Sequence, residues 1–115
     1  MAGRALPERA VAGLRDAFAG EVATRLPGMQ SAAAEVLTTG ALSSARTLIT
    51  HAHTLASSAA VLGEASASRI ARHCEEILLK ACADAESVPS DVAADAADDV
   101  EAVSMLLAPW LAGAA

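Results

Sequence analysis

The chain has 115 residues and a net charge of −6, and its side chains are 54% hydrophobic although only two, Phe18 and Trp110, are aromatic. This length suits one domain, residues 1–115, and an alanine-rich, aromatic-poor composition favours helices over sheets. The acidic balance argues against nucleic-acid binding, which needs basic side chains to neutralise phosphates.

The termini and the cysteines predict a cytoplasmic protein that does not contact a membrane. The segment from Met1 to Pro7 has no apolar leader, and no apolar run approaches the roughly 20 residues of a membrane span. Cys74 and Cys82 would lie roughly 12 Å apart on one helix, whereas a disulfide needs less than about 7 Å. We therefore expect both thiols to be reduced.

The spacing of apolar residues predicts two helical segments in the first third of the chain. Pro7 can begin the first segment, whose apolar residues keep helical spacing as far as Leu26. The Pro27-Gly28 pair is expected to break or kink it. Helical periodicity resumes over residues 29–38, and Gly40 is expected to end this second segment.

Three further helices follow. One is predicted from Ala41 to Leu62, with Gly63 in the position that follows a helix end. Ser66 is a candidate cap for the next, which precedes a linker at 84–90. Ser87 or Ser90 is a candidate cap for the last helix.

Pro109 is expected to end or bend the last helix. Short connections between amphipathic helices predict an all-α fold. We expect an antiparallel up-down four-helix bundle with an additional N-terminal helical segment.

His53 is predicted to face outward from its helix. At about 100° per residue, the apolar seam occupies a sector of roughly 60°, and His53 lies about 160° from the middle of that seam. The seam consists of Leu48, Leu55, Ala59 and Leu62. The neighbours of His53 at helical spacing are Arg46, Ile49, Thr50, Ala56, Ser57 and Ala60.

This outward face carries short and apolar side chains, without Glu, Lys or Asp between residues 48 and 62. A bare surface of this kind favours a docking site. An alanine-rich chain also produces such faces without any function, so both interpretations remain open.

The other histidines and the cysteines do not predict a metal site. His51 lies on the edge of the seam, where a half-buried ring with a hydrogen-bond partner is expected. Helical metal pairs need a spacing of three or four residues, which neither His51 with His53 nor His73 with Cys74 has. Cys74 lies on a core stripe as an inert thiol, and His73 flanks that stripe, either near the interface or in solvent.

The usual signatures of an enzyme are missing as well. The sequence has no glycine-rich phosphate loop, no serine nucleophile elbow and no distinctive pair of carboxylates. We therefore do not expect a conventional catalytic site.

The residues around His53 resemble those of the histidine-containing phosphotransfer (HPt) domains of two-component phosphorelays. Leu55, Ser58, Ala59 and Gly63 match at positions +2, +5, +6 and +10 from the histidine, and Ile70 and Cys74-Glu75 fit the following helix. The resemblance covers nearly the whole chain. It departs from the family pattern at +3 and +4, where a lysine and a glycine are replaced by Ala56 and Ser57.

The resemblance implies that His53 is phosphorylated, with Nε2 as the expected attacking nitrogen. The phosphoryl group would come from a sensor or hybrid histidine kinase, or from a receiver-domain aspartate, and pass to another receiver aspartate. A neutral imidazole suits this role near pH 7. Mg²⁺ is expected on the receiver, so the chain needs no cofactor of its own.

The same resemblance suggests a docking surface around His53. It comprises Arg46, Ile49, Thr50, Ala56, Ser57, Ala60 and Gly63. Ala56 leaves the site without the usual positive charge. The hydroxyl of Ser57 is expected to hydrogen-bond the imidazole or a phosphoryl oxygen.

Two other functions remain open at this point. One keeps the fold without the chemistry: a non-phosphorylated adaptor or inhibitor that binds a kinase or a receiver. The other is a structural helical interaction module. A phosphotransfer module of a chemotaxis kinase is a variant of the phosphorelay hypothesis, although a stand-alone protein is the simpler account.

Overall fold

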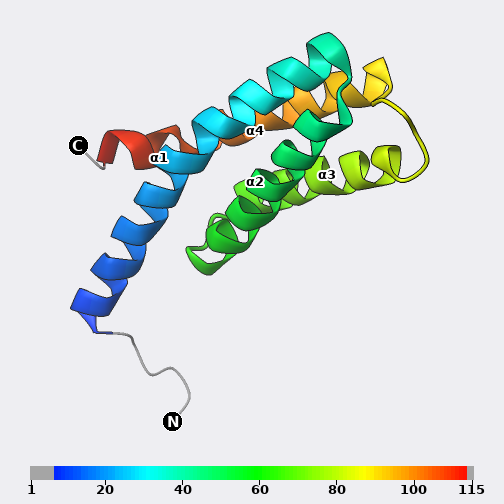
Figure 1. Ribbon diagram of the computed structural model, residues 1–115. Helices are drawn as coiled ribbons and strands as arrows, with labels where there is room; N and C mark the ends of the chain where they lie inside the picture. Colours follow the sequence, from blue (N-terminus) through cyan, green and yellow to red (C-terminus); the bar gives the residue numbers. More distant parts are fainter. Residues whose placement is uncertain (1–6, 114–115) are drawn as a thin grey trace.

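The computed structural model describes residues 7–113, which form four helices and no strand. The helices are α1 (Glu8–Thr39), α2 (Leu42–Val61), α3 (Ala65–Cys82) and α4 (Ser90–Gly113). Each helix packs against two others, in the order α1–α2, α2–α3, α3–α4 and α4–α1. This closed ring of neighbours is an antiparallel up-down four-helix bundle, as predicted (Figure 1).

Two glycines set the turns on either side of α2. Gly40 has φ 67° and Gly63 has φ 78°, a left-handed conformation that residues with a Cβ rarely adopt. The Gly40 N–H donates to the Val36 carbonyl at 2.8 Å, which closes the end of α1. The predicted bounds of α2 are confirmed to within one residue.

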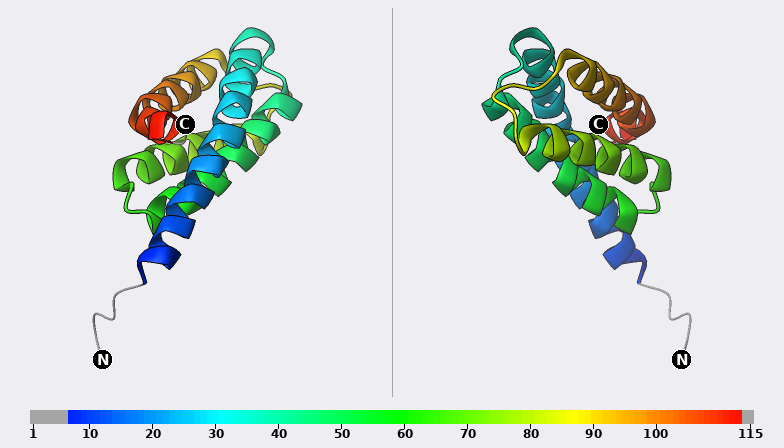
Figure 2. Two further views of the ribbon diagram at one scale, coloured as in Figure 1. Left: turned by 90° about the vertical axis from the view of Figure 1, so that its left-hand side faces the viewer. Right: turned by 90° about the vertical axis from the view of Figure 1, so that its right-hand side faces the viewer.

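Of the break or kink predicted at Pro27, the break is wrong, because α1 runs through it as one helix of 32 residues. Proline costs a helix about 3 kcal/mol. Phe18 and Val22 before it and Met29 and Val36 after it are all buried, so the continuous helix packs both halves into the core. The expected additional N-terminal segment is therefore the first part of α1, which projects beyond the α2–α3 turn (Figure 2).

The predicted serine caps of α3 and α4 and the predicted end of the last helix at Pro109 also differ from the structure. Ser66 lies inside α3, because the chain turns directly after Gly63 and helix α3 begins at Ala65. The Pro89 carbonyl accepts the first bond of α4, so it takes the place expected for a serine. Pro109 lies within α4, which continues to Gly113.

The core is built from leucine, valine and many alanines, as the composition predicts. Leu26, Leu48, Leu55, Leu78 and Leu107 are fully buried. Alanines fill much of the remaining contact area and allow the helices to approach closely; they include Ala45, Ala52, Ala59, Ala71 and Ala96. Ile49, Ile70 and Ile77 are only partly buried and pack against the edge of this core.

The cysteines behave as expected. Both are free, and Cys74 is buried. Burial raises the pKa of the Cys74 thiol to about 12, so it remains protonated near neutral pH.

A close contact between α1 and α2 depends on Gly28. A Cβ placed on Gly28 would lie 2.6 Å from Nε2 of His51. The absence of a side chain at this position lets the imidazole ring lie directly against the backbone of α1.

We expect Gly28→Ala to stabilise the protein only when His51 is also removed. In a His51→Ala background the substitution should add about 0.5–1 kcal/mol, the helix propensity of alanine over glycine. In the wild type the displaced ring should offset this gain. Urea unfolding of the four proteins of this double-mutant cycle measures the coupling, and equal effects in both backgrounds would contradict the contact.

Candidate functional site

His53 lies on α2 with its side chain 66% exposed, as the helical angles predict. Its Nδ1 is 2.8 Å from Oε2 of Glu75 on α3, and the Glu75 side chain is only 18% exposed. The exposed imidazole is therefore held at Nδ1 by a carboxylate from the neighbouring helix.

This contact determines which nitrogen of His53 is available for chemistry. A carboxylate accepts a hydrogen bond, so Nδ1 carries the proton and donates it. The lone pair of the neutral ring is then on Nε2, for which the described residues provide no hydrogen-bond partner. The arrangement yields an exposed, oriented nitrogen nucleophile.

The packing of α2 against α3 brings these two residues together although they are 22 positions apart. Gly63 reverses the chain, and one turn further along α2 the Ser68 hydroxyl donates to the Ala56 carbonyl at 2.8 Å. Leu55 and Cys74, which are close to the pair in sequence, are buried in the core. Sequence reasoning assigned no role to Glu75, and the only signal was the acidic residue that the HPt resemblance places after Cys74.

Most of the residues predicted around His53 do lie on an accessible face. Exposed residues are Arg46, Thr50, Ser57, Ala60 and Gly63, and Ile49 is half-buried. Ala56 was expected on this face, but it is buried at 1% exposure. The physical reason is that α2 packs against both α1 and α3, which makes its buried sector wider than the apolar seam alone suggests.

Ser57 does not contact the imidazole, contrary to expectation. Its hydroxyl donates to the backbone carbonyl of His53 at 3.1 Å. Thr50 makes the same kind of bond to the Arg46 carbonyl. Both hydroxyl protons are thus engaged by α2 itself, which is common for such residues inside helices.

His51 is half-buried and hydrogen-bonded, as predicted. Its Nδ1 lies 3.2 Å from Nη1 of Arg25 on α1. Burial lowers the pKa of His51, and the positive charge of Arg25 lowers it further. The ring is therefore a neutral packing element rather than an accessible nucleophile.

His73 forms a second imidazole–carboxylate pair. Its Nδ1 is 2.6 Å from Oδ2 of Asp99 on α4, and its side chain is 56% exposed. The hydrogen bond to Asp99 raises the pKa of His73, followed by the charge of Asp99 and smaller contributions from Glu76 and Asp95. A protonated ring has no free lone pair, so this pair favours a cation over a nucleophile.

The raised pKa of His73 predicts a pH-dependent contribution to stability. This contribution is fully present below about pH 6.5, the ordinary pKa of histidine, and is lost as the pH rises through the higher folded pKa. Asp99→Asn should therefore destabilise the protein at pH 6 but not at pH 9. Because the pair is exposed, we expect a difference of only about 0.2–1 kcal/mol.

Urea unfolding of wild type and Asp99→Asn between pH 5 and pH 9 measures this difference, and an NMR titration gives the pKa of His73 directly. A difference in the free energy of unfolding between the two proteins that grows toward pH 9 would contradict the prediction.

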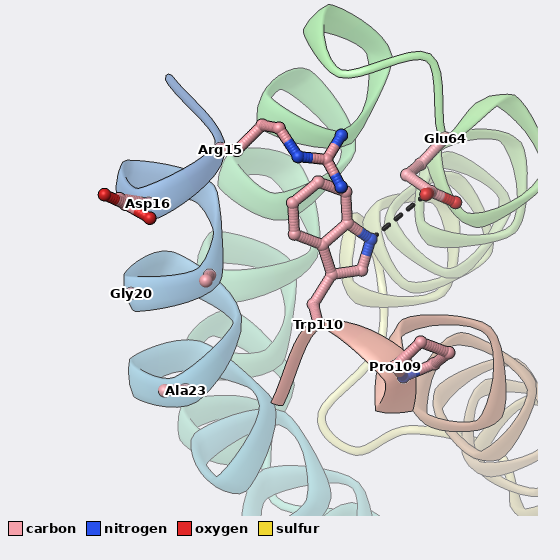
Figure 3. A pocket seen from close by; sticks show the side chains of 8 residues that line it. Arg15, Asp16, Gly20, Ala23, Glu64, Pro109 and Trp110 are labelled. Atoms are coloured by element: carbon pink, nitrogen blue, oxygen red, sulfur yellow. Dashed lines mark hydrogen bonds between the residues drawn. The ribbon is translucent and has the colours of Figure 1, made fainter. Parts of the chain in front are cut away.

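A separate hollow of about 580 Å³ lies where α1, α4 and the α2–α3 turn meet (Figure 3). The Trp110 ring dominates it: its Nε1 donates to Glu64 at 3.0 Å and the Arg15 guanidinium lies 4.6 Å from its centroid. Phe18 meets the same ring edge-on. These contacts join α1 and α4 to the α2–α3 turn, and neither His53 nor Glu75 lines this hollow.

Residues 7–113 contain no group of three or more side chains placed to hold a metal ion. None of the four helices described is long and apolar enough to cross a membrane. Comparisons of the chain with protein-family models, curated proteins and solved structures found no match.

Proposed function

We propose that this chain is a histidine phosphotransfer protein that carries a phosphoryl group on Nε2 of His53. The observation that supports this function best is the bond from Nδ1 of the exposed His53 ring to Glu75. In the neutral ring this bond places the lone pair on Nε2 of an exposed side chain, and a free lone pair and exposure are what an imidazole needs to accept a phosphoryl group from another protein.

The transfer step balances with the residues of this site. The Nε2 lone pair attacks the phosphorus of an aspartyl phosphate on a receiver domain. The N–P bond forms as the P–O bond to the aspartyl carboxyl breaks, and the aspartate leaves as a carboxylate. Nδ1 keeps its proton, so the ring becomes cationic and the Glu75 carboxylate stabilises that charge at 2.8 Å. The reverse step delivers the group to a second receiver aspartate.

Among the three histidines, His53 is the best candidate for this step. His51 is half-buried against Gly28, and the raised pKa of His73 favours the cationic form of that ring. His53 combines the more exposed of the two carboxylate-bonded rings with a bond that directs the lone pair of the neutral ring to Nε2.

The test is phosphorylation of the purified chain by two donors. One donor is phosphoramidate, a small molecule that phosphorylates imidazoles, and the other is a panel of radiolabelled phospho-receiver domains from the same genome. Wild type and His73→Ala should acquire acid-labile, base-stable label, and His53→Ala should not. A wild type that takes no label from either donor, or a His53→Ala protein labelled like wild type, would overturn the proposal.

The buried position of Ala56 favours one alternative, a non-phosphorylated adaptor that binds a kinase or a receiver. Helix α2 has no lysine or arginine within one turn of His53, and its one arginine, Arg46, lies two turns away. An adaptor predicts receiver or kinase binding that survives His53→Ala, together with the absence of phosphohistidine in the same assay.

A further inference from the structure

A groove of about 580 Å³ runs along the exposed face of α3 beside α2. Its basic lining consists of Arg69, Arg72 and His73, and small residues between the two helices complete it. Glu76 is the one acidic residue that lines it. The groove is therefore a basic surface on a protein whose net charge is −6.

The groove adjoins the His53 site on both helices. Ala60, which lines it, lies two turns beyond His53 on the same face of α2. Arg72 precedes Glu75 by one turn of α3, and Glu75 is the residue that contacts His53. A protein that covers His53 would thus extend naturally over these basic side chains.

The two arginines are available for a partner. Across residues 7–113, neither Arg69 nor Arg72 has a carboxylate within ion-pair distance. His73 differs from them, because its ring is bonded to Asp99 on α4, which raises the pKa of His73 and favours a protonated ring beside that carboxylate. Desolvating unpaired guanidinium groups against an apolar surface would be costly, so this lining favours an anionic partner.

The reaction creates a need for such a surface. The donor presents an acyl phosphate, which carries about −1.5 to −2 units of charge near pH 7. The Glu75 carboxylate lies next to the acceptor ring, so the two sites would otherwise repel each other. Apolar contacts offer little compensation, because Ala56 is buried and Ile49 is half-buried.

We propose that the groove formed by Arg69, Arg72 and His73 binds the acidic surface around the phosphorylated aspartate of a receiver domain and guides it onto His53. This inference rests on the proposed phosphotransfer function. Opposite charges increase the rate of productive encounter, and salt screens this effect. The groove acts on docking and leaves the chemistry at Nε2 unchanged.

The experiment compares Arg69→Gln/Arg72→Gln with wild type for the two donors described above. With a phospho-receiver, the variant should accept label about tenfold more slowly at low ionic strength, and the difference should shrink near 0.5 M salt. With phosphoramidate, both proteins should be labelled equally. Arg9→Glu is the matched control, since it makes the net charge two units more negative on the exposed start of α1.

Each outcome separates the two proposals. Equal transfer from the phospho-receiver to wild type and to the double variant overturns the groove and leaves phosphotransfer intact. Slower labelling by phosphoramidate as well assigns the arginines to His53 itself and overturns the docking role. If Arg9→Glu slows transfer equally, only the net charge matters and the groove is again refuted. A wild type that accepts no label overturns both proposals.

Discussion

Glu75→Gln should slow the phosphorylation of His53 by phosphoramidate about 10- to 100-fold, the usual effect of removing a group that orients a functional imidazole. The amide can donate as well as accept, so it no longer requires the proton to be on Nδ1. The fraction of rings with a free lone pair on Nε2 then falls. The amide also fails to stabilise the cationic ring that forms as the N–P bond is made.

A small donor is essential to this measurement because it needs no docking surface. Nitrogen NMR of the imidazole reports whether Nδ1 of His53 loses its proton in the variant, which a merely structural defect would not produce. Asp99→Asn is the matched control, since it removes the carboxylate of the other imidazole pair. If the proton has left Nδ1 of His53 in Glu75→Gln but the variant is labelled as fast as wild type, Glu75 does not act by orienting the imidazole.

Ala56→Lys should destabilise the fold by about 1–3 kcal/mol, the usual cost of forcing extra volume into a packed core. The HPt pattern has a lysine at this position, but here Ala56 is 1% exposed and its carbonyl accepts a bond from Ser68. A lysine at this position must displace part of the α2–α3 contact before its ammonium group reaches water.

Ser57→Lys provides the control, because it places the same side chain one residue later on the exposed face of α2. We expect its free energy of unfolding to stay within about 0.5 kcal/mol of wild type. Chemical unfolding of both variants measures the contrast. The prediction is contradicted if Ala56→Lys is as stable as wild type and is phosphorylated faster. In that case the lysine reaches the phosphoryl group, as the HPt pattern implies.

The two predictions together describe how charge is arranged at this site. On α2, Ala56 occupies the position of the lysine in the HPt pattern, and packing against α3 buries it. The neighbouring face of α3 carries Arg69 and Arg72 without ion-pair partners among the described residues. A positive surface can therefore be supplied by the adjacent helix.

The segment from Gly40 to Gly63 illustrates what the sequence determined by itself. Local physics governs each feature: glycines adopt the left-handed turns, and apolar residues recur with the helical period. The same period distinguishes the exposed His53 from the half-buried His51. These predictions hold because they depend on neighbours within one or two turns of the same helix.

Only the tertiary structure decided which groups meet across helices. Pro27 stays within α1 because burial on both sides of it outweighs the local cost, and Ala56 is buried because a second helix covers that flank of α2. The pairing of Glu75 with His53 depends on the register between α2 and α3. The packing of the whole core sets that register, so it cannot be predicted from the periodicity of a single helix.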